Sequence, residues 1–236
     1  VCHFSCGAAS AVATKLTLAE YPDREIVIIN AFIQEEHPDN RRFLADCEVW
    51  FAHPVTVLRD EKFNASVHEV WRRKRFIKSV YGAPCSMALK REVLDGFCKE
   101  DDLHVFGYTV EEQGKRPGIE RMMATGRSLF PLITRGLTHA DCEAMITRAG
   151  LVLPEMYRLG YNNANCIGCC KGGMGYWNKI RRDFPEQFNR VAEIEEGIGE
   201  GAYLFYDRKT GQRFGLKDLP PDAGRHQVET PSCSFL

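Results

Sequence analysis

The sequence has no long hydrophobic run and no excess of charge of either sign. Its longest apolar stretches fall far short of the roughly 20 residues that a membrane-spanning helix needs. The 31 basic and 32 acidic residues leave a net charge of -1, which argues against wholesale binding to nucleic acid or to membranes. The chain also lacks the charged lead and apolar core of a secretory signal. We therefore expect a cytoplasmic protein with a small or locally anionic ligand and no membrane partner.

Cysteine, by contrast, is abundant. The chain has 10 cysteines in 236 residues, and a cytoplasmic setting disfavours disulfides, which favours metal binding or redox chemistry for some of them. The others are expected to pack as small hydrophobic side chains among apolar neighbours, and these are Cys2, Cys47, Cys98 and Cys142.

Strand-like and helix-like segments alternate along the chain. Apolar patterns predict strands over 1–4, 25–30, 55–58 and 103–108, and helices over 11–20, 41–51, 67–79, 88–94 and 138–148. This rhythm predicts an α/β fold with a parallel sheet and helices on both faces. We expect one domain over residues 1–160. Residues 161–236 are expected to form a cysteine-rich extension with a loop, two helices over 176–183 and 186–196, a hairpin and a flexible tail.

The turn after the first strand carries small residues and hydroxyl groups. Ser5, Gly7 and Ser10 lie between a strand and a helix, where backbone N–H groups and the positive end of the helix dipole meet an anion. Glycine lets the backbone approach closely, and both hydroxyls can donate to phosphate oxygens. The turn is neither a Walker loop nor a dinucleotide fingerprint. It predicts a phosphate site, and a tight turn without a ligand is the alternative.

A second motif is Cys166-Ile-Gly-Cys169-Cys170. A Cys-x-x-Cys spacing lets two thiolates face one metal site, with glycine relieving the tight backbone. Three interpretations compete: an iron-sulfur cluster, a structural zinc ion and a redox-active dithiol without metal. Zinc is expected to bring a second Cys-x-x-Cys or a histidine pair, and the sequence has neither.

The stretch from Phe4 to Leu16, which includes the phosphate turn, resembles the first motif of the PP-loop superfamily, and within it the sulfonucleotide (PAPS and APS) reductases. Ala8 and Ala9 stand where ATP-splitting members carry Lys and Asp, which favours the reductase branch. Residues 107–112 resemble a second family element, with Thr109 in place of its arginine, and residues 153–161 resemble a third. The resemblance spans about residues 1–170. It implies a PP-loop (Rossmann-like) fold that binds an adenine nucleotide such as PAPS, APS or ATP.

The resemblance also implies a metal centre. Iron-sulfur members of the family carry an early cysteine site and then, about eighty residues later, a Cys-x-x-Cys motif, and together these hold one 4Fe-4S cluster. Cys85 matches the first site, since 166 minus 85 gives 81. The implied ligands are Cys85, Cys166 and Cys169, with Cys170 or Cys233 as the fourth. Cys233 lies in a tail similar to the one whose cysteine attacks the sulfate sulfur, so it is the candidate nucleophile, with a thioredoxin-like reductant.

Further nucleotide contacts are expected around the phosphate turn from Asn30, Glu36, Lys90, Arg91, Glu112 and Arg116. A solvated helix face or an acidic helix start is the alternative for these side chains. The leading function is that of a PAPS/APS-reductase-like enzyme of sulfur chemistry. One alternative is a sulfurtransferase that thiolates a nucleic acid, and another is an inert nucleotide-binding module. The sequence leaves the oligomeric state open, a homo-oligomer included.

Overall fold

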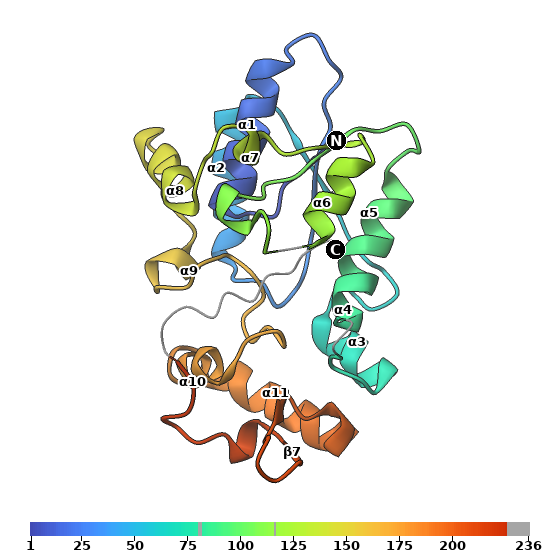
Figure 1. The fold of residues 1–236 in the computed structure, drawn as a ribbon, viewed down its shortest axis with the longest axis vertical. Coiled ribbons are helices and arrows are strands. Elements are labelled where there is room, and N and C mark those ends of the chain that lie inside the picture. Colours follow the sequence, from blue (N-terminus) through green and yellow to red (C-terminus); the bar gives the residue numbers. More distant parts are fainter. Residues whose placement is uncertain (80–81, 116, 226–236) are drawn as a thin grey trace.

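The centre of the fold is a five-stranded sheet. The computed structural model describes residues 1–79, 82–115 and 117–225 (Figure 1). All its strands are parallel, in the order β3-β2-β1-β4-β5. Their bounds are β1 (Cys2–His3), β2 (Ile28–Ala31), β3 (Val55–Leu58), β4 (His104–Val105) and β5 (Ser128–Leu129). The predicted α/β fold with a parallel sheet is thereby confirmed. The strand order reverses between β1 and β4, which is where open parallel sheets bind their ligands.

Helices cover both faces of the sheet. On one face lie α1 (Ala8–Glu20), α2 (Asp39–Phe51), α7 (Pro131–Thr134) and α8 (His139–Arg148), and on the other lie α5 (Glu92–Phe97) and α6 (Pro117–Ala124) (Figure 1). Side chains alternate accordingly along the strands. Cys2 and Val105 pack with α1, whereas Ile29 packs with Leu94 of α5. His3 and His104 therefore point to the α5 face.

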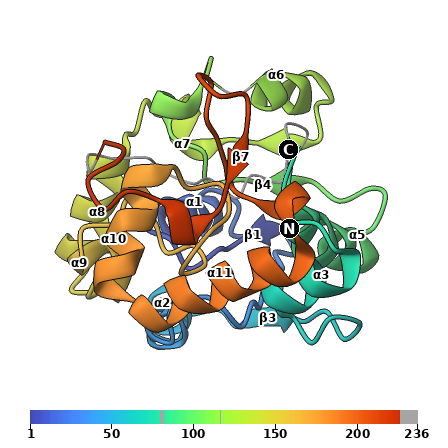
Figure 2. The same cartoon turned by 90° about the horizontal axis from the view of Figure 1, so that it is seen from below.

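The C-terminal part of the chain lies beyond one end of the sheet. It contains α9 (Glu155–Arg158), α10 (Met174–Asp183), α11 (Pro185–Ile198) and the antiparallel hairpin of β6 (Phe205–Tyr206) and β7 (Arg213–Phe214). Short 3-10 helices are η2 (Val110–Glu112), η3 (Glu200–Ala202) and η4 (Leu216–Asp218). Seen from below, α10 and α11 lie in front of the sheet (Figure 2). They share one hydrophobic core with α3 (Val67–Lys74) and α4 (Pro84–Ser86). The division at residue 160 stays a prediction.

Several helix ends differ from those expected. The first helix begins at Ala8 rather than Ala11, which places its N-terminus directly behind Gly7. The helix predicted over 67–79 ends at Lys74, because Arg75 takes a left-handed conformation with a φ of 49°. The helix expected over 88–94 extends from Pro84 to Phe97 through a π-helical turn, Met87–Arg91. The strand β5 and the helix α6 were not predicted.

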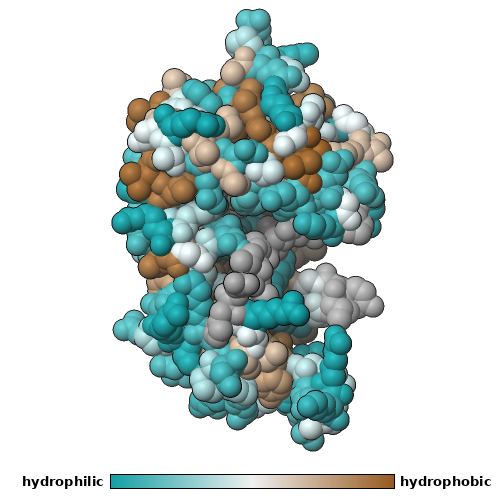
Figure 3. Space-filling view, turned by 60° about the vertical axis from the view of Figure 1, so that its left-hand side comes forward, coloured by the Kyte–Doolittle hydropathy of each residue, from teal (hydrophilic) through white to brown (hydrophobic). Residues whose placement is uncertain are grey.

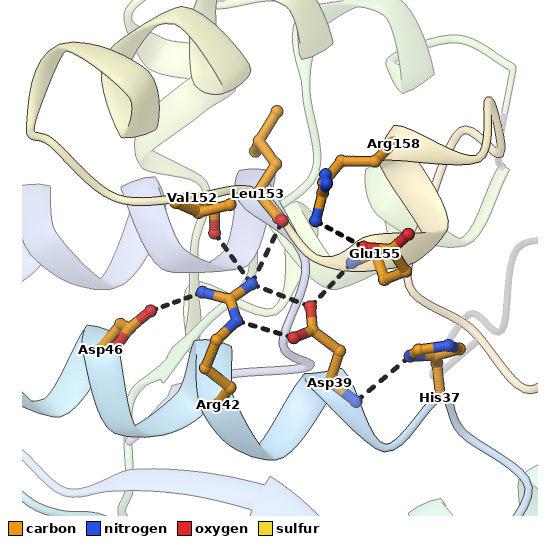
Figure 4. Close-up of polar contacts among 8 residues, drawn as sticks. All are labelled: His37, Asp39, Arg42, Asp46, Val152, Leu153, Glu155 and Arg158. Atoms are coloured by element: carbon orange, nitrogen blue, oxygen red, sulfur yellow. Dashed lines mark hydrogen bonds and ion pairs between the residues drawn. The ribbon is translucent and has the colours of Figure 1, made fainter.

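Arg42 connects α2 to the segment that leads into α9 (Figure 4). Its guanidinium donates to the carboxylates of Asp39 at 2.7 Å and Asp46 at 2.5 Å. It also donates to the backbone carbonyls of Val152 and Leu153. Asp39 in turn accepts from the Glu155 backbone N–H at 2.8 Å, and its hydrogen bond from Arg42 holds its pKa below the usual range. This network fixes where α9, with its residue Tyr157, meets the sheet.

The described part of the chain holds no helix long and apolar enough to cross a membrane. The molecular face that carries α8 and α9 is mostly hydrophilic, with hydrophobic side chains gathered in separate small patches (Figure 3). Such scattered apolar groups are ordinary for a protein surface.

Glu195 of α11 makes stability depend on pH. Its buried carboxylate accepts from the backbone N–H groups of Leu204 and Leu216, and burial raises its pKa to about 7. An unfolded glutamate has a pKa of about 4.3. The folded state therefore binds this proton more tightly, and stability falls as pH rises from about 4.3 to about 7. Between about pH 5 and about pH 8, the free energy of unfolding of Glu195→Gln is expected to fall by on the order of 3 kcal/mol less than that of the wild type. Urea unfolding at the two pH values measures this difference.

The matched control is Glu196→Gln, because Glu196 is solvent-exposed on the same helix. Its curve of stability against pH is expected to follow that of the wild type. A Glu195→Gln curve that also follows the wild type would contradict the assignment.

Candidate functional site

The turn after β1 is held together by the Ser10 hydroxyl. This oxygen accepts from the Ser5 backbone N–H at 3.1 Å and from the Ser5 hydroxyl at 3.2 Å, and it donates to the Gly7 carbonyl at 3.0 Å. Ser10 is buried, whereas Ser5 and Gly7 are half-buried. Between them Cys6 has a left-handed backbone with a φ of 56°. Ser10 thus shapes the turn, and Ser5 and Gly7 form its accessible part.

The helix N-terminus in this turn already has one partner. The backbone N–H of Ala8 donates to the hydroxyl of Tyr157, from α9, at 3.2 Å. Burial raises the pKa of Tyr157, so the phenol keeps its proton and can donate it to an anion. Tyr157 was not among the predicted site residues, although it lies in the stretch 153–161 that carries the family resemblance.

Replacing Tyr157 with phenylalanine leaves the Ala8 N–H without this acceptor. We expect the free energy of unfolding to fall by about 1 kcal/mol, as for the loss of one hydrogen bond. Urea denaturation measures the change. Tyr206→Phe is the control, because Tyr206 is 59% exposed, and its stability is expected to stay within about 0.5 kcal/mol of the wild type. Equal stability of Tyr157→Phe and the wild type would argue against the contact.

The backbone of the loop after β4 lies in close contact with the N-terminal end of α1. A Cβ on Gly107 would lie 2.5 Å from the Cα of Ser10 and 2.7 Å from its nitrogen, so only glycine fits there. Two residues on, Thr109 is fully buried and begins η2 with a capping box. In this box the Glu112 carboxylate accepts from the Thr109 N–H at 3.0 Å. Glu112, expected at the nucleotide, therefore has a local structural role.

Asn30 and Glu36 lie beneath the phosphate turn. The Asn30 amide donates to the Phe4 carbonyl at 2.8 Å and accepts from Arg41 at 3.3 Å, so it supports the turn from β2. Glu36 is buried, which raises its pKa, while Lys90 at 3.8 Å and Arg41 at 3.9 Å act against that rise. Both side chains lie close to the turn, within a buried polar network.

Lys90 and Arg91 both lie in the π-helical turn η1 (Met87–Arg91), and their side chains point to different places. Its wider spacing is seen in the hydrogen bond from the Glu92 N–H to the Met87 carbonyl, five residues back. Lys90 is buried and faces Glu36, whereas Arg91 lines a groove between α5 and α6. Such π-turns are frequent at functional sites.

Of the four cysteines predicted to act together, Cys85, Cys169 and Cys170 have thiols in contact, and Cys166 shares their core. Cys85 of α4 is 81 residues from Cys166 in sequence (166 minus 85), yet Cys85, Cys166, Cys169 and Cys170 are buried in a single core cluster. The Cys170 thiol hydrogen-bonds with those of Cys85 and Cys169. These bonds raise the pKa of Cys170 and lower that of Cys85, so Cys170 keeps its proton and its neighbours accept.

The loop 166–169 wraps around the hydroxyl of Tyr176. The backbone N–H groups of Gly168 and Cys169 both donate to this oxygen at 3.0 Å, and it donates to the Cys166 carbonyl at 3.2 Å. Gly168 has a φ of 80°, which favours glycine. Tyr176 was not among the predicted site residues. The tyrosine fixes the backbone that presents the cysteines.

Basic groups surround the sulfur atoms. The hydrogen bond with Cys170 lowers the pKa of Cys169 to about 7, and Lys171 and Lys90 act in the same direction. Lys78 is close enough to interact with Cys169 and Cys170, and burial lowers its own pKa. Thiols beside cationic groups are the kind of donor that iron-sulfur clusters use, because the cluster carries net negative charge.

The turn after β1 lies near the cysteine cluster, which consists of Cys85, Cys166, Cys169 and Cys170. The Ile167 backbone N–H donates to the Glu35 carbonyl at 2.8 Å, joining the cysteine loop to the segment after β2. A cavity of ≈ 10 Å³ lies beside Ser5, between Asn30 and Lys90, which is room for about one water molecule. Arg116 and Cys233, also predicted at the site, lie outside the described residues.

The sheet order and the turn at its switch point define an α/β protein of Rossmann-like architecture, consistent with a PP-loop fold. Comparison with protein-family models and with curated proteins finds no match for this chain.

Proposed function

We propose that this chain binds the phosphate end of an adenine nucleotide at the β1 turn and carries out sulfur chemistry beside an iron-sulfur cluster. The leading form is a reaction like that of the PAPS/APS reductases. The proposed cluster ligands are Cys85, Cys166, Cys169 and Cys170. Ser5 and Gly7, with the Tyr157 hydroxyl, would contact the anion.

The observation that carries this proposal is the position of Lys90. This buried ammonium lies 3.8 Å from Glu36 and interacts electrostatically with Cys169 of the cluster and with Cys6 of the turn. A single cation between the two places supports a common role for them. A buried lysine is costly unless it is paired. Glu36 already pairs with this ammonium, and a bound anion or a negatively charged cluster nearby would stabilise the buried cation further.

In the proposed reaction the thiolate of Cys233 attacks the sulfur of the sulfonucleotide. A sulfur–sulfur bond forms, the sulfur–oxygen bond to the phosphate breaks, and the nucleotide phosphate leaves with the electron pair. A thiol of a thioredoxin-like protein then attacks the Cys233 sulfur and releases sulfite. The cluster, when bound, would order the loop 166–170 and tune the electrostatics of the site. Tyr157 would donate a hydrogen bond to a phosphate oxygen.

A second candidate is a sulfurtransferase that thiolates a nucleic acid. Thr109 favours it, because this residue is fully buried and its backbone N–H and hydroxyl both contact Glu112. The resemblance places an arginine at this position for the sulfonucleotide, and here a buried threonine bonded to Glu112 stands in its place. A different substrate would account for that change.

Anaerobically purified full-length chain tests both candidates. About four irons per chain with visible cluster absorption are expected. PAPS and APS are then offered with thioredoxin, and sulfite is measured, while tRNA and DNA are offered with a sulfide source and examined by mass spectrometry. Sulfite release that is lost in Cys233→Ser supports the reductase, and thiolated nucleic acid supports the second candidate. Nucleotide binding with neither product, or a folded iron-free protein, would overturn the proposed chemistry.

A further inference from the structure

Two histidines meet on the α5 face of the sheet, away from the cysteine cluster. His3 of β1 and His104 of β4 lie on adjacent strands, and Nε2 of His3 is 3.0 Å from Nδ1 of His104. Cys98, at the end of α5, completes the group. One ligand atom from each of these three residues lies within 4.8 Å of the other two. Among the residues that the structure describes, this is the group of three that meets that limit.

Each of the three side chains sits on a regular element. The His3 ring stacks on Phe106 with the centroids 4.5 Å apart and an angle of 10° between the planes, which fixes its orientation. The His104 backbone N–H donates to the Arg127 carbonyl at 2.9 Å, and that of Cys98 to the Leu94 carbonyl at 2.9 Å. Ligands held on strands and at a helix end are positioned before an ion arrives.

The spacing suits a tetrahedral ion. Zinc bonds nitrogen at 2.0–2.1 Å, so two histidine nitrogens on one zinc ion lie about 3.4 Å apart. The observed separation of 3.0 Å needs only a small widening.

The three ligands line a groove of ≈ 810 Å³ between α5, β4 and α6. Its walls carry the basic side chains of Arg91, Lys99, Arg121 and Arg127 together with Asp95 and Glu100. Three protein ligands with one open position are typical of catalytic zinc sites, whereas structural sites use four. A groove of this volume accommodates a small organic ligand.

We propose that His3, Cys98 and His104 bind a divalent zinc ion whose fourth position opens into this basic groove. Water or the anionic group of a small ligand completes the coordination there. Cys98, expected from the sequence to pack as a hydrophobic side chain, is only half-buried and takes a ligand role. The site goes beyond the proposed function, since none of its ligands belongs to the cysteine cluster or to the β1 turn.

Cobalt titration of the full chain, freed of metal with a chelator, tests the proposal. Co²⁺ is the probe because it occupies zinc sites and absorbs visible light when bound to thiolate. Wild type, Cys98→Ser and His104→Ala are compared with His53→Ala, whose imidazole lies in a loop far from β1 in sequence. Cobalt held by the cysteine cluster is common to all four proteins and cancels in the difference.

Both ligand variants are expected to bind about one Co²⁺ fewer per chain than wild type, or to bind it about 100-fold more weakly. Cys98→Ser should also lose the sulfur-to-cobalt absorption in the difference spectrum. His53→Ala should match the wild type. Equal stoichiometry and affinity in wild type and Cys98→Ser would overturn the proposal. Cys98 is half-buried at a helix end, so this variant decides the matter even where His104→Ala does not fold. Iron content at the other centre, measured before the chelator is added, is expected to be the same in wild type and Cys98→Ser, which separates this test from that of the proposed function.

Discussion

Replacing Gly107 with alanine is expected to destabilise the protein by more than about 4 kcal/mol. The new Cβ would lie 2.5 Å from the Ser10 Cα and within 3 Å of two further backbone atoms of α1. Backbone cannot move aside as the end of a flexible side chain can, so the β4 loop and the first turn of α1 must separate. A domain is typically stable by about 5–15 kcal/mol. We therefore expect little folded protein, and loss of nucleotide binding in what remains.

Gly197→Ala is the matched control for this change. Gly197 lies inside α11, and a Cβ there would meet no atom within 4 Å. Alanine in a helix interior is favoured over glycine by about 1 kcal/mol, so this variant is expected to be as stable as the wild type or more so. Urea denaturation followed by circular dichroism compares the three proteins. If Gly107→Ala unfolded at the same urea concentration as the wild type, the close approach of Gly107 to the backbone of α1 would be wrong.

The second large effect is expected from Cys169→Ser. Cys169 is buried, lies beside the Cys170 thiol, and has its pKa lowered to about 7 by that contact and by nearby lysines. A serine hydroxyl stays protonated at pH 7 and is a poor ligand for iron. We expect bound iron in anaerobically purified protein to fall from about four per chain to less than about one, with loss of the visible absorption.

Cys47→Ala controls for the loss of a buried thiol as such. Cys47 is also fully buried, but it packs with α1 in a separate hydrophobic core, which contains none of the proposed cluster ligands. Its replacement is expected to lower stability by about 1 kcal/mol and to leave the iron content unchanged. If Cys169→Ser kept its full complement of iron, the cysteine cluster would not be the metal centre.

The regular parts of the fold were predictable because their sequence patterns are strong. The strand Val55–Leu58 has the bounds that its apolar run predicts, and Thr138 caps its helix as expected. The strand β5, Ser128 and Leu129, was missed because Arg127 precedes it and Pro131 follows soon after, so it lacks the longer apolar run that surrounds the equally short β1 and β4. The π-helical turn at Met87–Arg91 also leaves no local signal, because side-chain contacts from other elements hold it.

The candidate site was predictable to a smaller degree. The motif spacing and the family resemblance together predicted that Cys85 lies near the segment 166–170, and the structure brings these residues together. The roles of Tyr157 and Tyr176 were missed, because an aromatic residue in a sequence predicts burial and not the partner of its hydroxyl. Those partners are backbone N–H groups of loops whose path depends on the completed fold.

The helical run from Pro84 to Phe97 holds Cys85 and Cys98 at a fixed distance from each other. It carries Cys85 near its first residue and is followed directly by Cys98, 13 residues later (98 minus 85), a separation of about 20 Å along a helix axis. Ions bound at its two ends would lie too far apart to share a ligand atom, so each would bind independently of the other. Deleting one residue from the π-helical turn would rotate everything after it by about 100°. Cys98 would then swing away from the two imidazoles while Cys85 stayed with its neighbours.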